Sequence, residues 1–125
     1  MDIALMNWAA VIVGAVAAFG LGMLWFSPRM FGKAWAAGSH NIQAPASPPI
    51  MAMVIQFIGT AILALVVGIT ETNQAIMTAI GAILAVALFV AGMDLFSQKS
   101  SKATVIDASY VVASGALMIL AQGLI

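Results

Sequence analysis

The chain has 125 residues, of which 64% are hydrophobic and only 6% are charged, against roughly 25% charged residues in an ordinary soluble domain. This composition is typical of an integral membrane protein. Four basic and four acidic side chains give a formal net charge of zero, so the chain has no basic field that would attract nucleic acid. The absence of cysteine excludes disulfides, iron-sulfur clusters and cysteine-based zinc sites.

Four apolar segments are long enough to span a bilayer, which takes about 20 residues of helix. They cover approximately residues 3–26, 50–70, 75–96 and 105–125. Backbone groups in lipid must satisfy their own hydrogen bonds, and the segments are twice as long as a barrel strand, so each predicts a helix. The predicted fold is all-α, a polytopic membrane protein formed by a single domain over residues 1–125 with four transmembrane helices in up-and-down order. The first segment lacks a basic leader and is too long for a signal peptide, so we expect it to be retained.

The charges predict how this domain is oriented. All four basic residues fall in the connections after the first and third spans, which lie on one face: Arg29, Lys33, Lys99 and Lys102. Asp2 and Glu71 lie on the other face. The positive-inside rule therefore predicts a multi-pass protein of the cell (inner) membrane, with both termini outside and the basic loops cytoplasmic.

The stretch that follows the first span, residues 27–49, predicts a short helix and a linker. Ser27 is expected to cap this helix and Pro28 to be its first residue. Its aromatic and cationic side chains fall on opposite arcs, which favours an interfacial helix that contacts anionic lipid of the inner leaflet. An irregular loop with two stop-transfer charges is the alternative. The expected lipid-interface residues are Trp25, Phe26, Arg29, Phe31, Lys33 and Trp35.

Several short motifs in this region are shared with a known family. Asn7-Trp8, the run Leu24 to Pro28, and Phe31-Gly32-Lys33 resemble the signature of the small bacterial membrane-protein family catalogued as domain of unknown function 1761. The sequence departs from that pattern at Phe26, where the family usually has tyrosine. The resemblance implies a membrane protein of four helices and implies no particular reaction.

Small residues recur at every fourth position in the first two spans, which predicts close helix packing. The first span carries such a ridge, with Asn7 on the same side, and the second repeats it with Ala52 and Gln56 at its start. The predicted packing seam consists of Ala10, Gly14, Ala18, Gly22, Thr60, Ala64 and Gly68. The pattern leaves open whether these seams close within one chain or between chains, and we expect a homo-oligomer or a subunit of a membrane complex.

Polar residues gather toward the predicted cytoplasmic ends of the spans. An ionisable residue inside a membrane is a candidate functional group, because its burial is costly unless it is paired or hydrated. Asp94 and Asp107 lie near span ends, so ion pairs with Lys99 and Lys102 are favoured over a proton-coupling site. The candidate polar vestibule consists of Gln56, Thr60, Asp94, Asp107, Tyr110 and Ser114.

Other chemistry receives little support from the sequence. His40 stands alone in the linker, and the methionines lack the spacing of a copper site, so we predict no metal and no cofactor. No arrangement of nucleophile, base and acid is apparent, so the chain is not expected to be an enzyme. Two functions remain: an oligomeric transporter or channel for a small solute or ion, and an accessory subunit that docks a larger complex through its small-residue seams.

Overall fold

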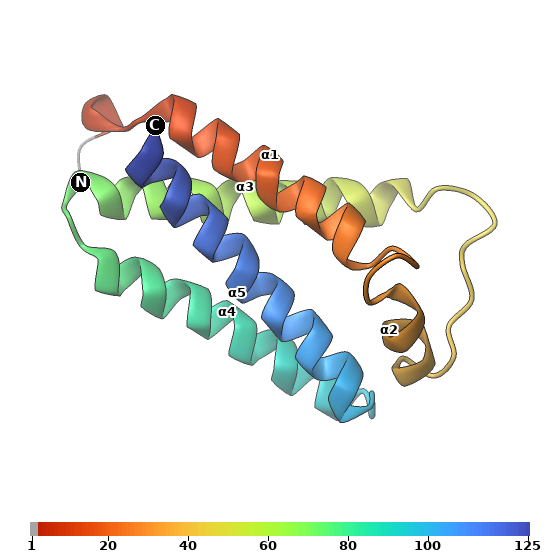
Figure 1. The fold of residues 1–125 in the computed structure, drawn as a ribbon. Helices are drawn as coiled ribbons and strands as arrows, with labels where there is room; N and C mark the ends of the chain where they lie inside the picture. The colour runs from red at the N-terminus through yellow and green to blue at the C-terminus, as the bar shows by residue number, and fades with distance from the viewer. Residues whose placement is uncertain (1–2) are drawn as a thin grey trace.

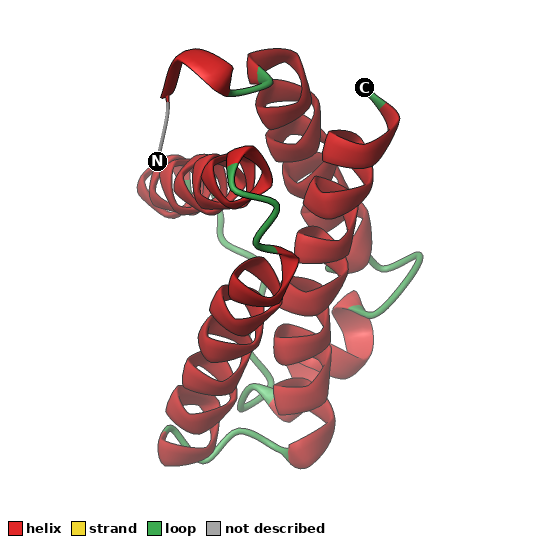
Figure 2. Cartoon of the chain, turned by 90° about the vertical axis from the view of Figure 1, so that its left-hand side faces the viewer, coloured by secondary structure: helices red, strands yellow, loops and turns green. Residues whose placement is uncertain are grey.

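The computed structural model describes residues 3–125, and within that range its regular secondary structure consists of helices joined by loops (Figures 1 and 2). A short 3-10 turn, η1 (Ile3–Leu5), precedes five α-helices. These are α1 (Trp8–Trp25), α2 (Gly32–Gly38), α3 (Ile50–Thr72), α4 (Ile76–Phe96) and α5 (Ser101–Leu124). All but α2 are long and apolar enough to cross a membrane, so the all-α, four-span fold predicted from the sequence is confirmed. Asp2, whose charge entered the orientation argument, lies outside the described residues.

The helix boundaries differ from the predicted ones by more than one residue at three points, and side-chain caps explain two of them. The first helix begins at Trp8, because the side-chain oxygen of Asn7 accepts a hydrogen bond from the Ala10 backbone N–H at 3.1 Å and so caps the helix. Asn7 is thus a cap and not part of a helical ridge. Helix α5 begins at Ser101, four residues earlier than expected, because Ser100 makes the equivalent bond to the Ala103 N–H at 3.1 Å. Helix α3 continues to Thr72, two residues further than expected.

The short second helix begins at Gly32, so the prediction that Ser27 and Pro28 start it is wrong. The Ser27 hydroxyl donates backward to the Leu24 carbonyl at 2.6 Å and therefore satisfies the end of α1. Backbone bonds from Phe31 to Trp25 and from Gly32 to Ser27, at 3.0 and 2.9 Å, then close a compact turn. A side chain on Gly32 would overlap the Phe26 carbonyl oxygen, which explains why this turn requires glycine.

Helix α5 is the centre of the molecule, because it contacts α1, α2, α3 and α4 and crosses in front of α3 and α4 in Figure 1. The end of the bundle that holds the C-terminus, here called the packed end, contains the hydrophobic core. There, residues from all four long helices are buried together: Val11, Ala15, Ala18, Ala64, Val67, Ala79, Ile83 and Met118. Toward the opposite end, here called the α2 end, α4 and α5 diverge from α3 (Figure 1), and every residue from 50 to 59 is exposed.

Candidate functional site: a cavity at the α2 end

The motif after the first span forms an aromatic cluster that ties α1 and α2 to α5. The Trp25 indole N–H donates to the Ile106 carbonyl at 3.0 Å, and the Tyr110 hydroxyl donates to the Ala18 carbonyl at 2.8 Å. Each helix thus supplies one side-chain donor to the backbone of the other. Phe26 packs edge-on against both Tyr110 and Trp35, at centroid distances of 5.4 and 5.7 Å. The cluster orders the α2 end around α5.

This packing differs from the prediction that the aromatic side chains at residues 25–35 all contact the lipid interface. Of the six expected lipid-interface residues, Trp25, Phe26 and Trp35 contact each other or α5 and are only partly exposed. The remaining three are exposed: Arg29, Phe31 and Lys33. Phe31 also packs on Trp25, at a centroid distance of 4.9 Å. The motif therefore holds helices together as well as presenting side chains outward.

Contacts between the end of α2 and the start of α5 keep Trp35 in place. The Ser100 backbone N–H donates to the Gly38 carbonyl at 2.9 Å, and a ring nitrogen of His40 lies 2.7 Å from the Ser97 carbonyl oxygen. A side chain on Gly38 would overlap the Ser100 hydroxyl, so glycine is needed for this approach. His40, expected to be a lone surface residue, is exposed but bonds across the chain to the loop after α4.

A three-residue ion cluster lies beside this contact. The Lys99 ammonium is 3.6 Å from the Asp94 carboxylate and 3.5 Å from the Asp107 carboxylate. It also lies 5.1 Å from the centre of the Trp35 ring, within the range of a cation-π interaction. Lys102 is exposed, and no ion pair from it occurs within residues 3–125, so of the two lysines considered only Lys99 joins the aspartates.

The backbone after α4 explains why Lys99 reaches both carboxylates. Gln98 has a φ of 62°, a left-handed conformation that reverses the chain as in a Schellman motif. The Gln98 and Lys99 N–H groups donate to the Leu95 and Asp94 carbonyls, both at 3.0 Å. This turn carries Lys99 back over the last turn of α4. The sequence lacks the glycine that usually marks such a cap, and so the turn was not predicted.

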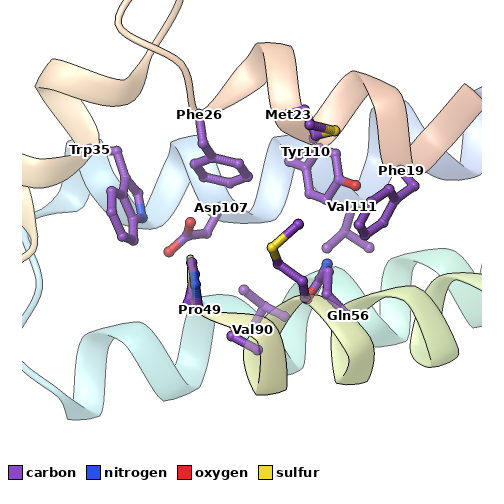
Figure 3. Close-up of a pocket in the computed structure, with 13 residues that line it drawn as sticks. Phe19, Met23, Phe26, Trp35, Pro49, Gln56, Val90, Asp107, Tyr110 and Val111 are labelled. Carbon is purple, nitrogen blue, oxygen red and sulfur yellow. The ribbon is translucent and has the colours of Figure 1, made fainter. Parts of the chain in front are cut away.

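A cavity of about 510 Å³ opens next to the ion cluster, between α1, α3, α4 and α5. Figure 3 shows Asp107 reaching into it from α5, beside Trp35, Phe26 and Pro49. Most of the lining is apolar, and the polar side chains of the wall are Asp107, Gln56 and Tyr110. Neither Asp94 nor Lys99 lines the cavity, so Asp107 is the carboxylate of the cluster that faces it.

A second cavity of about 410 Å³ continues from the first toward the packed end. The two share four lining residues: Gln56, Val90, Tyr110 and Val111. Thr60 and Ser114 line the second cavity, and the Ser114 hydroxyl is buried without a hydrogen-bond partner among the described residues. Met118, which is 2% exposed, closes this cavity on the side of the core.

The structure therefore brings together five of the six vestibule residues predicted from the sequence. Gln56, Thr60, Asp107, Tyr110 and Ser114 line one or both cavities. The sixth, Asp94, lies behind Asp107 and reaches it through Lys99. Sequence reasoning included Tyr110 but missed Phe26 and Trp35 of the same wall, although the predicted topology puts both near the membrane face that Tyr110 approaches.

The small-residue ridges pack within the chain, and the ridge of α1 contacts α5. On α1, a side chain on Gly14 would lie 3.1 Å from the Met118 Cα, and one on Gly22 would lie 2.6 Å from the Tyr110 hydroxyl, so this ridge packs on α5. Ala10 and Ala18 are buried on the same helix. On α3, Thr60, Ala64 and Gly68 are buried, and Gly68 approaches Val11 of α1. Ala52 and Gln56, at the start of the α3 ridge, are exposed.

Comparison with known proteins gives a family and no further relatives. No match was found among curated proteins or among solved structures. A family model described as "Protein of unknown function (DUF1761)" matches residues 9–123, a range that covers the four long helices except for the first residue of α1 and the last of α5, together with the aromatic cluster and both cavities. The chain therefore belongs to this family, as the motifs Leu24 to Pro28 and Phe31-Gly32-Lys33 predicted.

Proposed function

We propose that this protein is a small membrane transporter whose solute site is the cavity at the α2 end. The observation that carries the proposal is a charged side chain, Asp107, in the wall of a cavity that is otherwise largely apolar and lies among four membrane-crossing helices. Ionisable groups inside helical membrane bundles commonly belong to ligand sites, because burying a charge there is costly unless it is paired or hydrated.

The shape of the cavities supports transport over simple binding. The first cavity opens at the α2 end, and the second extends it as far as Met118, which packs on Gly14 of α1. A solute that entered from the α2 end would meet this contact as the barrier to passage. Under the orientation expected from the basic residues, the open side is cytoplasmic, and exposed Arg29 and Lys33 contact anionic lipid there.

Uptake into proteoliposomes tests this function with three impermeant probes of different charge: phenyl glucoside, benzyltrimethylammonium and benzenesulfonate. Ala52 lines the cavity and is exposed, so Ala52→Trp fills the cavity without disturbing the core. Met51→Trp is the matched control, because Met51 is 74% exposed and lines neither cavity. We expect uptake of at least one probe by wild type and Met51→Trp and its loss in Ala52→Trp. Uptake of none of the probes would overturn the proposal.

An accessory subunit of a larger membrane complex is the second candidate function. It is supported by the first half of α3, where residues 50–59 are all exposed although they include the polar side chain of Gln56, a group that helix partners in membranes commonly cover. In that case the protein purified in a mild detergent migrates with unlike partners. A homo-oligomer in the same experiment favours the transporter.

A further inference from the structure

We infer that the solute bound in this cavity is an organic cation, an ammonium ion attached to an apolar body. This inference rests on the proposed function for the location of the site and adds the chemical class of the ligand. It is carried by three independent features of the cavity wall: its charge, its aromatic rings and its lack of metal ligands.

With both carboxylates ionised, the cluster of Asp94, Asp107 and Lys99 carries a net charge of −1. Asp94 and Asp107 share the single ammonium group of Lys99, and within residues 3–125 no other cation pairs with either carboxylate. Asp94 is only 9% exposed, and its Oδ2 atom is buried with no hydrogen-bond partner among the described residues. Because unbalanced negative charge in a low-dielectric site attracts a cation, and Asp107 is the member that lines the cavity, the missing positive charge is best supplied from the cavity.

The rings next to Asp107 are suited to an ammonium group. Phe19, Phe26, Trp35 and Tyr110 all line the same cavity. Trp35 already holds one cation, since the Lys99 ammonium lies 5.1 Å from its ring centre. Aromatic faces combined with a carboxylate are the usual means by which proteins recognise alkylated ammonium ions. Asp107 disfavours anions here, and a neutral solute leaves two carboxylates sharing the single ammonium group of Lys99.

The remaining wall disfavours an inorganic ion. Met23, Met53 and Val90 also line the cavity, whereas a dehydrated sodium or magnesium ion needs several oxygen ligands. Among residues 3–125 no group of three or more acidic, histidine or cysteine side chains could hold a metal. An apolar body attached to the charged nitrogen, in contrast, displaces water from these side chains and gains from their contact.

Equilibrium dialysis of the purified protein in nanodiscs with radiolabelled benzyltrimethylammonium tests this inference. We expect saturable binding that excess unlabelled probe displaces and that equimolar benzenesulfonate or sodium does not. Asp107→Asn should weaken binding about tenfold or more, as expected for the loss of a close opposite charge in a partly desolvated site. Asp107→Glu, which keeps the charge, should retain most of the affinity. Glu71→Gln is the matched control, because Glu71 is an exposed carboxylate at the far end of α3.

Thermal unfolding of each variant separates loss of binding from loss of fold, and Ala52→Trp blocks the cavity without touching the ion cluster. Absence of saturable binding to the folded wild type would overturn the inference, as would unchanged affinity in folded Asp107→Asn. Displacement by sodium at the same concentration would also overturn it and assign the site to inorganic cations. Binding of benzyltrimethylammonium without uptake would refute transport and support the inferred ligand class. Uptake of phenyl glucoside or benzenesulfonate alone would support transport and refute the inferred ligand class.

Discussion

At the scale of single residues, a few polar side chains fix how the helices meet at the α2 end. Tyr110 and Trp25 each donate to a backbone carbonyl of the opposite helix. Such bonds persist in a membrane interior because the carbonyl oxygen that accepts them has no competing water. Glycine at position 22 leaves the space in which the Tyr110 hydroxyl lies, so these two residues form one structural unit.

Removal of the Tyr110 hydroxyl should lower stability by a modest amount. We expect Tyr110→Phe to reduce the free energy of unfolding by about 1 kcal/mol, the usual contribution of one interhelical hydrogen bond. Ser109→Ala is the control, because the Ser109 hydroxyl bonds only to carbonyls of its own helix. Denaturation in mixed detergent micelles measures both variants. Equal effects of the two changes would show that the bond to Ala18 contributes nothing.

The two lysines of the α4–α5 region should respond differently to neutralisation. Lys99→Gln leaves two neighbouring carboxylates without their cation, so we expect a loss of about 2 kcal/mol, less than for a fully buried pair because the Lys99 side chain is 22% exposed. Lys102→Gln, which breaks no ion pair among residues 3–125, should change stability by less than about 0.5 kcal/mol. The same denaturation assay compares the two variants. A similar loss of stability in both would mean that the change in net charge, and not the loss of the Lys99 ion pairs, is responsible.

At the scale of helices, close approach of α1 to α5 depends on one glycine of the α1 ridge. A side chain at position 14 meets the Met118 backbone, whereas one at position 20 of the same helix meets nothing within 4 Å. We therefore expect Gly14→Leu to destabilise the bundle by about 1 to 3 kcal/mol, as overpacking commonly does. Gly20→Leu should be neutral or slightly stabilising, because leucine forms helix better than glycine.

Thermal unfolding in a mild detergent, read by circular dichroism, distinguishes these two variants. Their matched position on one helix removes differences in helix propensity and hydrophobicity. If Gly14→Leu and Gly20→Leu unfold at the same temperature, the small-residue ridge of α1 does not set the distance between α1 and α5.

The four long helices could be predicted from the sequence, but their neighbours could not. Length and apolar composition were sufficient for the four long helices, because lipid permits few alternatives to a helix. The ridge spacing indicated that Gly14 and Ala64 would be buried but not which helix each would meet. That choice depends on α5, whose own small residues are interspersed with polar ones. The start of α2 was misplaced because the Ser27 hydroxyl can cap either the preceding or the following helix, and only the tertiary fold decides between them.

The cavity was partly accessible to the same reasoning. Polar residues on one arc of α5 predicted a shared vestibule, and Asp107, Tyr110 and Ser114 line the two adjoining cavities. The places of Phe26 and Trp35 in the cavity wall and the position of Lys99 could not be predicted from the sequence. They follow from two turns, the compact one before Gly32 and the left-handed one at Gln98. The left-handed turn has glutamine where glycine is usual, and a turn without glycine or proline at the decisive position leaves little trace in a single sequence.

At the scale of the whole molecule, all connections that carry basic residues lie at the α2 end, and the α3–α4 connection lies at the opposite end (Figure 1). The absence of native cysteine allows the orientation to be tested with single-cysteine variants at exposed positions. We expect Asn73→Cys to react with an impermeant thiol reagent in intact cells and Ser47→Cys to react only after lysis. The reverse pattern would mean that the α2 end faces outside.

The central place of α5 has a consequence for how the protein is made. Helix α1 ends at Trp25 and its principal neighbour begins at Ser101, so at about 5–20 residues per second the ribosome takes on the order of ten seconds to supply that neighbour. During this interval the faces of α1 and α4 that pack on α5 are open to lipid or to other membrane proteins. The bundle can therefore close only after its last helix has left the translocation machinery, and a ribosome that stalls before Ser101 leaves an insertable but unassembled chain for the quality-control proteases.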